Sequence, residues 1–245
     1  MVPTLAALCF DAQDPSAVGR FWAAVLQRRL ADDVDGTILL PNIATEFPIR
    51  FRPADQPRTT RNRFHFDLTS SSLDDQQRIV ALARDNGATD LDVGQTATET
   101  HVVLADPEGN EFCVIEPGNN FLADTAAIGG LAGDGTQRVG YFWRDAVEWP
   151  LVWDQDEETA IQSPLGGTKI TWGGPPVAAK AGVARLRFEL SVPDGDLETA
   201  ADRLLQLGAS RLSTDAPRPH DVVGGVVLAD PDGNEFSLRT VTAPG

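Results

Sequence analysis

One nonapeptide occurs twice in this chain, as LADPEGNEF at residues 104–112 and as LADPDGNEF at residues 228–236. The two copies differ only at Glu108 and Asp232, and they lie 124 positions apart in a chain of 245 residues. A chain of this length can form one large domain or two domains of about 120 residues. A repeat at this spacing favours two related domains, because a fixed internal period marks a repeated structural unit.

The repeat extends well beyond the nonapeptide. GRFWAAVL at residues 19–26 is matched by GYFWRDAV at residues 140–147, and in both the apolar residues recur at helical spacing. FPIRFRP at residues 47–53 matches TKITWGG at residues 168–174 as a strand. FHFDL, from residue 64, is an alternating strand that leads into a helix with a capping-box-like start at Ser72. Each copy therefore divides into two halves that each read strand, helix and three strands.

The nonapeptide itself has the composition of a hairpin turn. Asp-Pro begins a turn, and the glycine supplies a positive φ angle. A calcium loop does not fit, because its twelve-residue ligand spacing is missing. We therefore predict a domain at residues 1–118 and a second at residues 125–245, joined by a linker at residues 119–124 that is rich in turn residues.

Composition excludes several classes of function. The 36 acidic residues outnumber the 20 basic ones, for a net charge of −16, which argues against a nucleic acid partner because phosphate binding needs a basic face. No apolar run is long enough to span a membrane. The first ten residues lack the basic segment of a secretory signal. Cys9 and Cys113 lie in apolar strand-like runs, so we expect free thiols in a cytoplasmic protein.

The ordered motifs D-P-x-x-x-G-x-F-W, H-F-D-L and D-P-x-G-N-E-F resemble those of the vicinal oxygen chelate superfamily, and most of all its glyoxalase-like branch. That superfamily includes glyoxalase I, extradiol dioxygenases and bleomycin-binding proteins. The resemblance implies an α+β fold of two tandem domains. Each would consist of paired βαβββ modules that form a curled mixed sheet, or cup, with helices outside. It does not specify a reaction, because one fold supports many functions.

The resemblance also allows the metal site to be checked by position. In metal-dependent members, the ligands come from the first and last strands of each module. In the first copy these positions hold Ala7, Arg50 or Arg52, His65 and Cys113. In the second copy they hold Ile128, Thr171, Arg187 and Ser237. Only His65 matches, and arginine repels a cation, so we expect no divalent metal cofactor.

An alternative keeps a metal in the first copy. Strand alternation and the hairpin register place Val103 opposite Cys113, which brings His101 to the face that carries His65. His65, His101 and Cys113 form a set of soft ligands that zinc or iron could accept. The protein would then be a metal-dependent lyase, isomerase or dioxygenase that uses His65, His101 and Cys113 or Glu111.

Polar residues alternate with apolar ones on the predicted core strands. The polar face is either plain solvent-exposed sheet or, where the sheet curls, a ligand cup. In the first copy it carries Arg50, Arg52, His65, Asp67, His101 and Glu111. In the second it carries Lys169, Thr171, Arg187, Glu189, Glu235, Ser237 and Arg239. Trp149 and Trp153 either line the second cup or join the core, and Trp22 and Trp143 belong to helix stripes that face the core.

From these features we predict a small organic ligand, or substrate, in the cup of the first copy. The protein would be a sequestering binder, as bleomycin-resistance proteins are, or a metal-independent enzyme. His65 is the candidate general acid or base, oriented by Asp67 or Glu111, and Arg50 or Arg52 would hold an anionic group. The second copy has no histidine on its core strands, because His220 lies in a loop. It could therefore be only a structural or dimerisation partner, and a homodimer is compatible with the sequence.

Overall fold

The computed structural model describes residues 1–33, 36–54, 60–96, 99–180, 182, 184–193, 195–212 and 225–241. These residues form four successive βαβββ modules, two in each sequence repeat. Module 1 contains β1 (Thr4–Ala12), α1 (Pro15–Leu26), β2 (Leu30–Asp33), β3 (Gly36–Leu39) and β4 (Ile49–Pro53). Module 2 contains β5 (Phe64–Leu68), α2 (Leu73–Asp85), β6 (Thr89–Asp90), β7 (Val102–Ala105) and β8 (Glu111–Val114).

The second repeat has the same order of elements. Module 3 contains β9 (Ile128–Gly133), α3 (Gln137–Val147), β10 (Leu151–Gln155), β11 (Glu158–Gln162) and β12 (Lys169–Trp172). Module 4 contains β13 (Leu186–Pro193), α4 (Leu197–Leu207), β14 (Ser210–Arg211), β15 (Val226–Ala229) and β16 (Glu235–Val241). The predicted fold class, α+β with two tandem copies of paired βαβββ modules, is confirmed. None of the described helices is long and apolar enough to cross a membrane.

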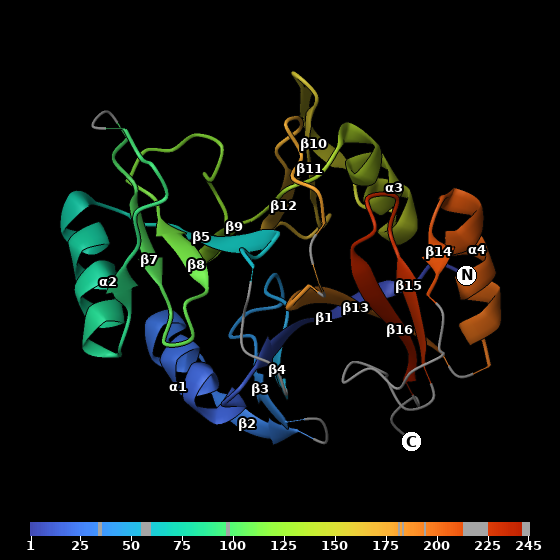
Figure 1. Cartoon of the computed structure of the whole chain (residues 1–245), viewed down its shortest axis with the longest axis horizontal. Helices are drawn as coiled ribbons and strands as arrows, with labels where there is room; N and C mark the ends of the chain where they lie inside the picture. The colour runs from blue at the N-terminus through green and yellow to red at the C-terminus, as the bar shows by residue number, and fades with distance from the viewer. Residues whose placement is uncertain are drawn as a thin grey trace.

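The modules pair across the repeats. Sheet A has the order β14-β15-β16-β13-β1-β4-β3-β2, and sheet B has the order β10-β11-β12-β9-β5-β8-β7-β6 (Figure 1). Antiparallel pairing of β1 with β13 joins modules 1 and 4, and antiparallel pairing of β5 with β9 joins modules 2 and 3. The expectation that residues 1–118 build one cup is therefore wrong, because β4 with Arg50 and β5 with His65 lie in different sheets.

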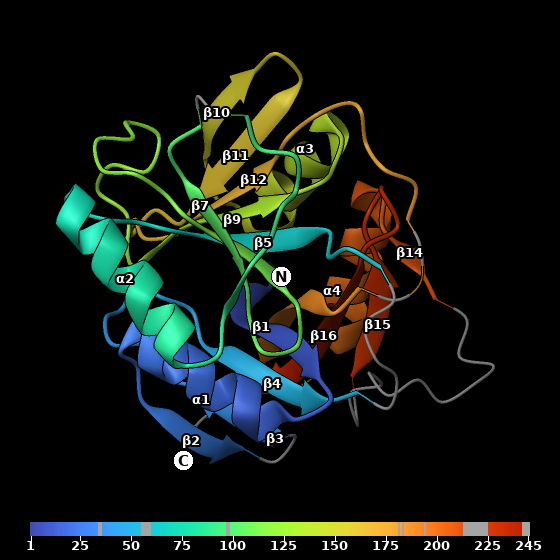
Figure 2. The same cartoon turned by 60° about the vertical axis from the view of Figure 1, so that its left-hand side comes forward.

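The hydrophobic core, in contrast, joins the two modules within each repeat. Helix α1 contacts α2, and α3 contacts α4, as Figures 1 and 2 show. The indole of Trp22 on α1 packs edge-on against Phe66 and Phe112 of module 2, with ring centroids 4.9 and 5.0 Å apart. Trp143 on α3 packs in the same way on the phenylalanines of module 4. The core positions predicted for both tryptophans are confirmed.

The helix ends follow the signals in the sequence. The side chain of Asp14 caps α1 by accepting a hydrogen bond from Ala17 N, and Pro15 occupies the first helical turn. At α2 the hydroxyl of Ser72 accepts from Asp75 N, as the capping-box pattern predicts. Each helix is therefore delimited locally, while its apolar stripe decides which face it buries.

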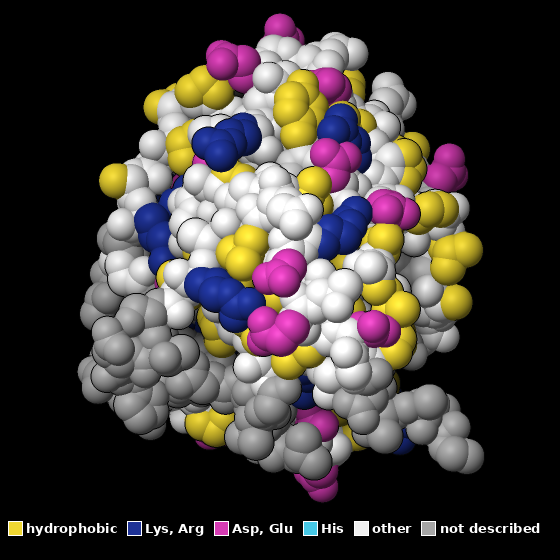
Figure 3. All heavy atoms as spheres, turned by 90° about the vertical axis from the view of Figure 1, so that its right-hand side faces the viewer, with side chains coloured by type: hydrophobic (Ala, Val, Ile, Leu, Met, Phe, Trp, Pro, Cys, Tyr) yellow, Lys and Arg dark blue, Asp and Glu magenta, His cyan; other side chains and the backbone are white. Residues whose placement is uncertain are grey.

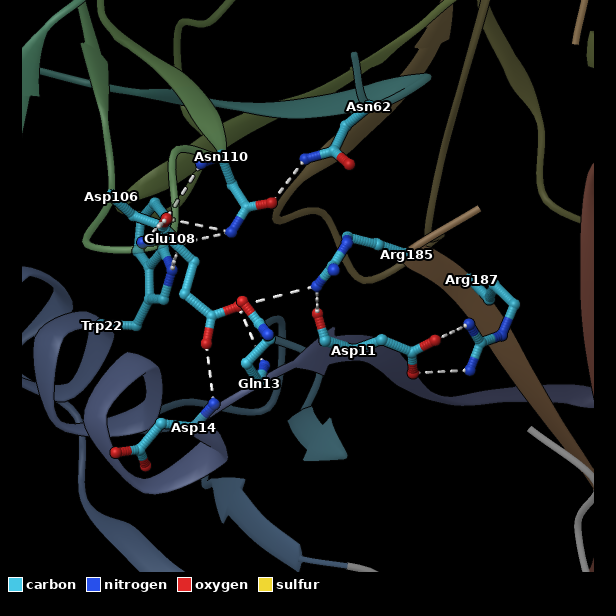
Figure 4. Close-up of polar contacts among 10 residues, drawn as sticks. All are labelled: Asp11, Gln13, Asp14, Trp22, Asn62, Asp106, Glu108, Asn110, Arg185 and Arg187. Atoms are coloured by element: carbon cyan, nitrogen blue, oxygen red, sulfur yellow. Dashed lines mark hydrogen bonds and ion pairs between the residues drawn. The ribbon is translucent and has the colours of Figure 1, made fainter. Parts of the chain in front are cut away.

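The repeated nonapeptide anchors the β7–β8 hairpin to helix α1 of the neighbouring module (Figure 4). One oxygen of Asp106 accepts from the backbone N of Glu108 and of Asn110, both at 2.9 Å, and the other accepts from the Trp22 indole at 3.3 Å. The Glu108 carboxylate accepts from the backbone N of Gln13 and Asp14, at 3.0 and 2.8 Å, directly before α1. The motif is repeated because it forms the turn and also fastens that turn to a helix.

The second hairpin uses the same contacts with one adjustment. Asp230 bonds the Trp143 indole at 3.2 Å, as Asp106 does for Trp22. Asp232, which stands where the first copy has Glu108, accepts from the backbone N and the hydroxyl of Thr136, at 2.6 and 2.9 Å. The one difference between the two nonapeptides therefore matches a difference in donors. Glu108 binds two backbone amides, and Asp232 binds the amide and hydroxyl of one threonine.

Candidate functional site

In each sheet the face opposite the helices is polar, and we call these the polar faces of sheets A and B. On β5, Phe64, Phe66 and Leu68 are buried on the helix side, so alternation turns His65 and Asp67 to the polar face. The register sets His65 opposite Ala132 of β9. The two polar faces have the same origin in the fold, yet they carry different chemistry.

The polar face of sheet A centres on Glu189, whose side chain is fully buried. The Nη1 atom of Arg50 donates to both carboxylate oxygens, at 2.8 and 3.0 Å. Nη2 of Arg52 lies 3.4 Å from the same carboxylate, and Nε of Arg239 lies 3.1 Å from it. Three guanidinium groups, from modules 1 and 4, thus meet on one carboxylate of β13.

A second ion pair lies beside this cluster. Nη2 of Arg187 donates to Oδ1 of Asp11 at 2.8 Å, and both side chains are nearly fully buried. The thiol of Cys9 lies 3.5 Å from the Glu189 carboxylate, and burial together with that negative charge raises the pKa of the Cys9 thiol to about 12. A divalent metal does not fit here, because guanidinium groups surround the carboxylate that would bind it.

The polar face of sheet B lines a cavity of about 520 Å³. His65, Glu111 and Cys113 of module 2 lie on its wall, next to Ala132 and Thr171 on the neighbouring strands of module 3. The segments that connect the two sheets, residues 60–63 and residues 173–179, supply further lining residues. One chain contributes both modules, so these walls form without a second copy of the protein.

His65 is partly accessible from the cavity, with 38% of its side chain exposed. Its Nε2 lies 3.4 Å from Oδ1 of Asp67. Burial lowers the pKa of His65, but the hydrogen bond and charge of Asp67, with the charges of Glu111 and Asp134, outweigh that effect and hold the pKa above its ordinary value. An imidazole of this kind can carry a proton near neutral pH and give it to a bound molecule.

Cys113 shares the same carboxylate. Burial raises the pKa of its thiol well above the ordinary range, and the charge and hydrogen bond of Asp67 raise it further. A thiol that keeps its proton is a poor nucleophile. Gly130 of β9 lies opposite Asp67, and a Cβ there would approach Asp67 Oδ2 to 3.2 Å, so the glycine leaves room for this carboxylate.

Sheet B can supply three donor atoms to a metal. Those of His65, Asp67 and Cys113 lie within 4.8 Å of one another, and nitrogen, oxygen and sulfur ligands suit zinc. The facing strand β9 presents Gly130 and Ala132, which offer no side-chain ligand. His65 and Cys113 would both bind as deprotonated ligands, although their pKa values are raised.

The other predicted site residues are divided between the sheets. The predicted pairing of Val103 with Cys113 is confirmed, but His101 precedes β7 and neither joins the cluster of donor atoms nor lines the cavity. Arg50 and Arg52 lie on sheet A, apart from His65. The residues predicted to line a second cup also lie on two different sheets. Arg187, Glu189, Glu235, Ser237 and Arg239 lie on sheet A, whereas Lys169 and Thr171 lie on sheet B.

Neither of the two tryptophans offered as ligand contacts lines the cavity. Trp149 packs against the hydrophobic core. Trp153 is 37% exposed on the edge strand β10, with its ring 5.8 Å from that of Phe121. Sequence reasoning missed Arg61 and Arg63, which do line the cavity. Carrying the alternation of β5 back by two residues from His65 would have identified Arg63.

The net charge of the protein does not mark a binding surface on the face shown in Figure 3. Acidic and basic side chains are interspersed there, and apolar side chains lie scattered among them. We therefore identify the candidate site by the cavity of sheet B and not by surface charge.

Comparisons with known proteins agree with this architecture. The profile of a family described as a glyoxalase-like domain matches residues 7–115 and again residues 131–239. The structure is similar to that of glyoxalase I from Zea mays, with a TM-score of 0.66 and 15% identity over 96% of this chain and 92% of that one. It also resembles a putative dioxygenase from Bacillus subtilis subsp. subtilis str. 168, with a TM-score of 0.60 and 13% identity over 100% and 86% of the two chains. No curated protein matches the sequence.

Proposed function

The chain belongs to the glyoxalase-like domain family, in two tandem copies, and we propose that it binds a small organic molecule in the cavity of sheet B and exchanges a proton with it through His65. The cavity carries this proposal, because it combines about 520 Å³ of space with a partly exposed imidazole on its wall. A volume of this size is typical of small-molecule sites, which join apolar walls to a few convergent polar groups.

The groups around His65 support an acid–base role. Asp67 orients the imidazole and stabilises its cationic form. His65 would act first as a proton donor, because its pKa is raised, and would then recover the proton as a base. Glu111 is the second carboxylate on the cavity wall. A protein that only binds the molecule would be a sequestering protein, whereas turnover would make it a metal-independent enzyme.

We propose that this function needs no divalent metal. The ligand positions on sheet A are occupied by arginines that hold Glu189. On sheet B the thiol of Cys113 and the imidazole of His65 both interact with Asp67, so a metal would have to displace the thiol proton and break both contacts. The free thiols Cys9 and Cys113 favour a reducing compartment such as the cytoplasm.

The cluster of His65, Asp67 and Cys113 favours a second candidate, a metal-dependent lyase, isomerase or dioxygenase. These three residues would hold the ion, which would supply Lewis acid chemistry to a bound oxygen. Elemental analysis of protein purified without chelator separates the candidates. Stoichiometric zinc or iron that disappears in a His65→Ala variant favours the second candidate, and protein that binds ligand without metal favours the first.

The main proposal is tested by filling the cavity. Ala132 lies on the cavity wall opposite His65, so Ala132→Leu should abolish binding of hits from a library of small organic fragments. Ala81→Leu makes the same change on the exposed surface of α2 and should leave binding intact. Incorporation of solvent deuterium into a bound fragment, lost in His65→Gln, would separate proton exchange from simple binding. Fragments that bind equally to both leucine variants would refute the proposed site.

A further inference from the structure

Most of the charged side chains on the wall of the sheet B cavity already have a partner. His65 lies on the wall and interacts with Asp67, with 3.4 Å between the nearest atoms. Nε of Arg61 lies 3.7 Å from Oε1 of Glu111, and the Arg61 side chain is 72% exposed. Neither carboxylate is therefore available as an unoccupied site for a cationic ligand.

Of the two arginines on this wall, Arg63 is the one without a carboxylate partner among the described residues. It makes no ion pair within the described ranges, and its one side-chain hydrogen bond there runs from Nη2 to the carbonyl oxygen of Asp134 at 3.4 Å. Its Nε atom is buried and has no acceptor. A buried donor without an acceptor costs about 1–3 kcal/mol, and more where the group is charged, so this guanidinium is suited to an acceptor that the protein itself does not supply.

The backbone places Arg63 on the same face of the sheet as His65. The carbonyl of Arg63 accepts from Asp134 N at 2.8 Å, which continues the β5–β9 ladder by one residue. Alternation along the strand then puts Arg63, His65 and Asp67 on the same face, with successive members roughly 6–7 Å apart. An anionic group held by Arg63 would thus lie beside the imidazole of His65.

We propose that Arg63 binds the carboxylate of a small organic acid in the sheet B cavity, and that this group determines which ligands the cavity accepts. The inference rests on the proposed function, because it names the chemical class of the molecule that the cavity takes. A guanidinium suits a carboxylate because its donors form a planar fork that can bond both oxygens. The ligand would present its carboxylate to Arg63 and the remainder of its framework to Ala132 and Thr171, which lie beside His65 on the next two strands of the sheet.

Matched pairs of simple probes test this inference. Benzoate and benzamide, hexanoate and hexanamide, and 2-naphthoate and 2-naphthamide differ within each pair only in the charged group. Their dissociation constants are measured by NMR titration of the intact protein, following the backbone signals of Ala132 and Thr171. We expect each carboxylate that binds to do so at least about tenfold more tightly than its amide, as a charged hydrogen bond implies.

Variants assign the preference to one residue. Arg63→Gln should bring the ratio of the two dissociation constants close to one, with the amide affinity unchanged, and Arg63→Lys should retain part of the preference. Arg84→Gln is the matched control, because Arg84 is a half-exposed arginine of α2 that pairs with Asp90 and does not line the cavity, and it should leave the ratio as in the wild type.

The outcomes separate this inference from the proposed function. Carboxylates and amides that bind the cavity with equal affinity would overturn the role of Arg63 and leave the cavity as the binding site. A preference for carboxylates over amides that persists in Arg63→Gln would likewise overturn the role of Arg63 and leave the cavity as the binding site. If no probe shifts the signals of the cavity residues, the proposed function fails, and the inference about Arg63 fails with it.

Discussion

The polar faces of sheets A and B arise from the same pairing of βαβββ modules, but one is closed and the other open. In sheet A the long side chains of Arg50, Arg52 and Glu189 contact one another, and each is at most 7% exposed. In sheet B the wall around His65 includes the small residues Ala132 and Gly133, and a cavity remains. Side-chain size and mutual charge pairing, not the sheet itself, therefore decide whether such a face leaves room for a ligand.

Substitutions on the two polar faces should also have different effects, one on stability and the other on ligand binding. Buried ions that hold one another contribute to stability through their partners, because a charge left alone in the interior is costly. Polar groups around a cavity are partly hydrated and contribute little to packing. Substitutions on sheet A should therefore affect folding, and substitutions on sheet B should affect binding.

The largest expected effect is that of Glu189→Gln. The change removes the negative charge that Arg50, Arg52 and Arg239 share. The free energy of unfolding should fall by about 3–5 kcal/mol, with a decrease in Tm of roughly 10 °C for a chain of this size. Urea unfolding measures the change. His65→Gln on sheet B is the control and should cost less than about 1 kcal/mol, and equal losses for the two variants would remove the distinction between the faces.

The hairpin anchors should behave alike in both repeats. Asp106→Ala leaves the Trp22 indole and the turn amides without their acceptor, and Asp230→Ala does the same at Trp143. Each variant should lose roughly 2–3 kcal/mol, the cost of hydrogen bonds to a buried charged group. Calorimetry of both variants checks whether the repeats differ only at their polar faces. A loss confined to one hairpin would show that the repeats are not equivalent elsewhere.

The two thiols should report on the two environments. Cys9 is 1% exposed beside Glu189, so it should resist iodoacetamide in the native protein. Cys113 lines the cavity, and the charge of Asp67 helps to raise the pKa of its thiol. Asp67→Asn should lower that pKa and speed alkylation of Cys113 by roughly tenfold for each unit of the decrease. Peptide mass spectrometry over time would follow each thiol, and an unchanged rate in Asp67→Asn would contradict the assigned role of that carboxylate.

The smallest expected effect is the pH dependence contributed by His65. Its pKa lies above the ordinary value of 6.5 in the folded protein, so its stabilisation is complete below about pH 6.5 and disappears as the pH rises through the folded pKa. Solvent screening of a side chain that is 38% exposed keeps this contribution below about 1 kcal/mol. The difference in urea midpoint between wild type and His65→Gln, measured from pH 6 to pH 9, tests the sign. A difference that grows with pH would contradict it.

The local elements could be predicted from the sequence because their signals are local. The apolar stripe of α1, the Ser72 cap of α2 and the turn at Asp106 each depend on a few neighbouring residues. The pairing of Val103 with Cys113 followed from the same local reasoning, because a hairpin fixes its own register.

The grouping of the site residues could not be predicted in this way. The sequence repeat describes four similar modules, but it contains no local signal that β1 pairs with β13 and β5 with β9. Because both contacts join residues far apart in the chain, local patterns place Arg50 in the sheet of His65, although its partner Glu189 lies 139 positions later. The lining residue Arg63 is missed for a different reason, since it lies directly before β5 (Phe64–Leu68) and is outside the strand both as predicted and in the structure.

We propose that the polar face of sheet B, and not that of sheet A, binds the ligand. The most direct measurement is a crystal structure of the protein soaked with a library of small organic fragments. We expect fragment density against His65, Ala132 and Thr171 in the sheet B cavity, with the contacts of Glu189 to its arginines unchanged. Density among Arg187, Glu189 and Glu235 on sheet A, with the sheet B cavity free of fragments, would contradict it.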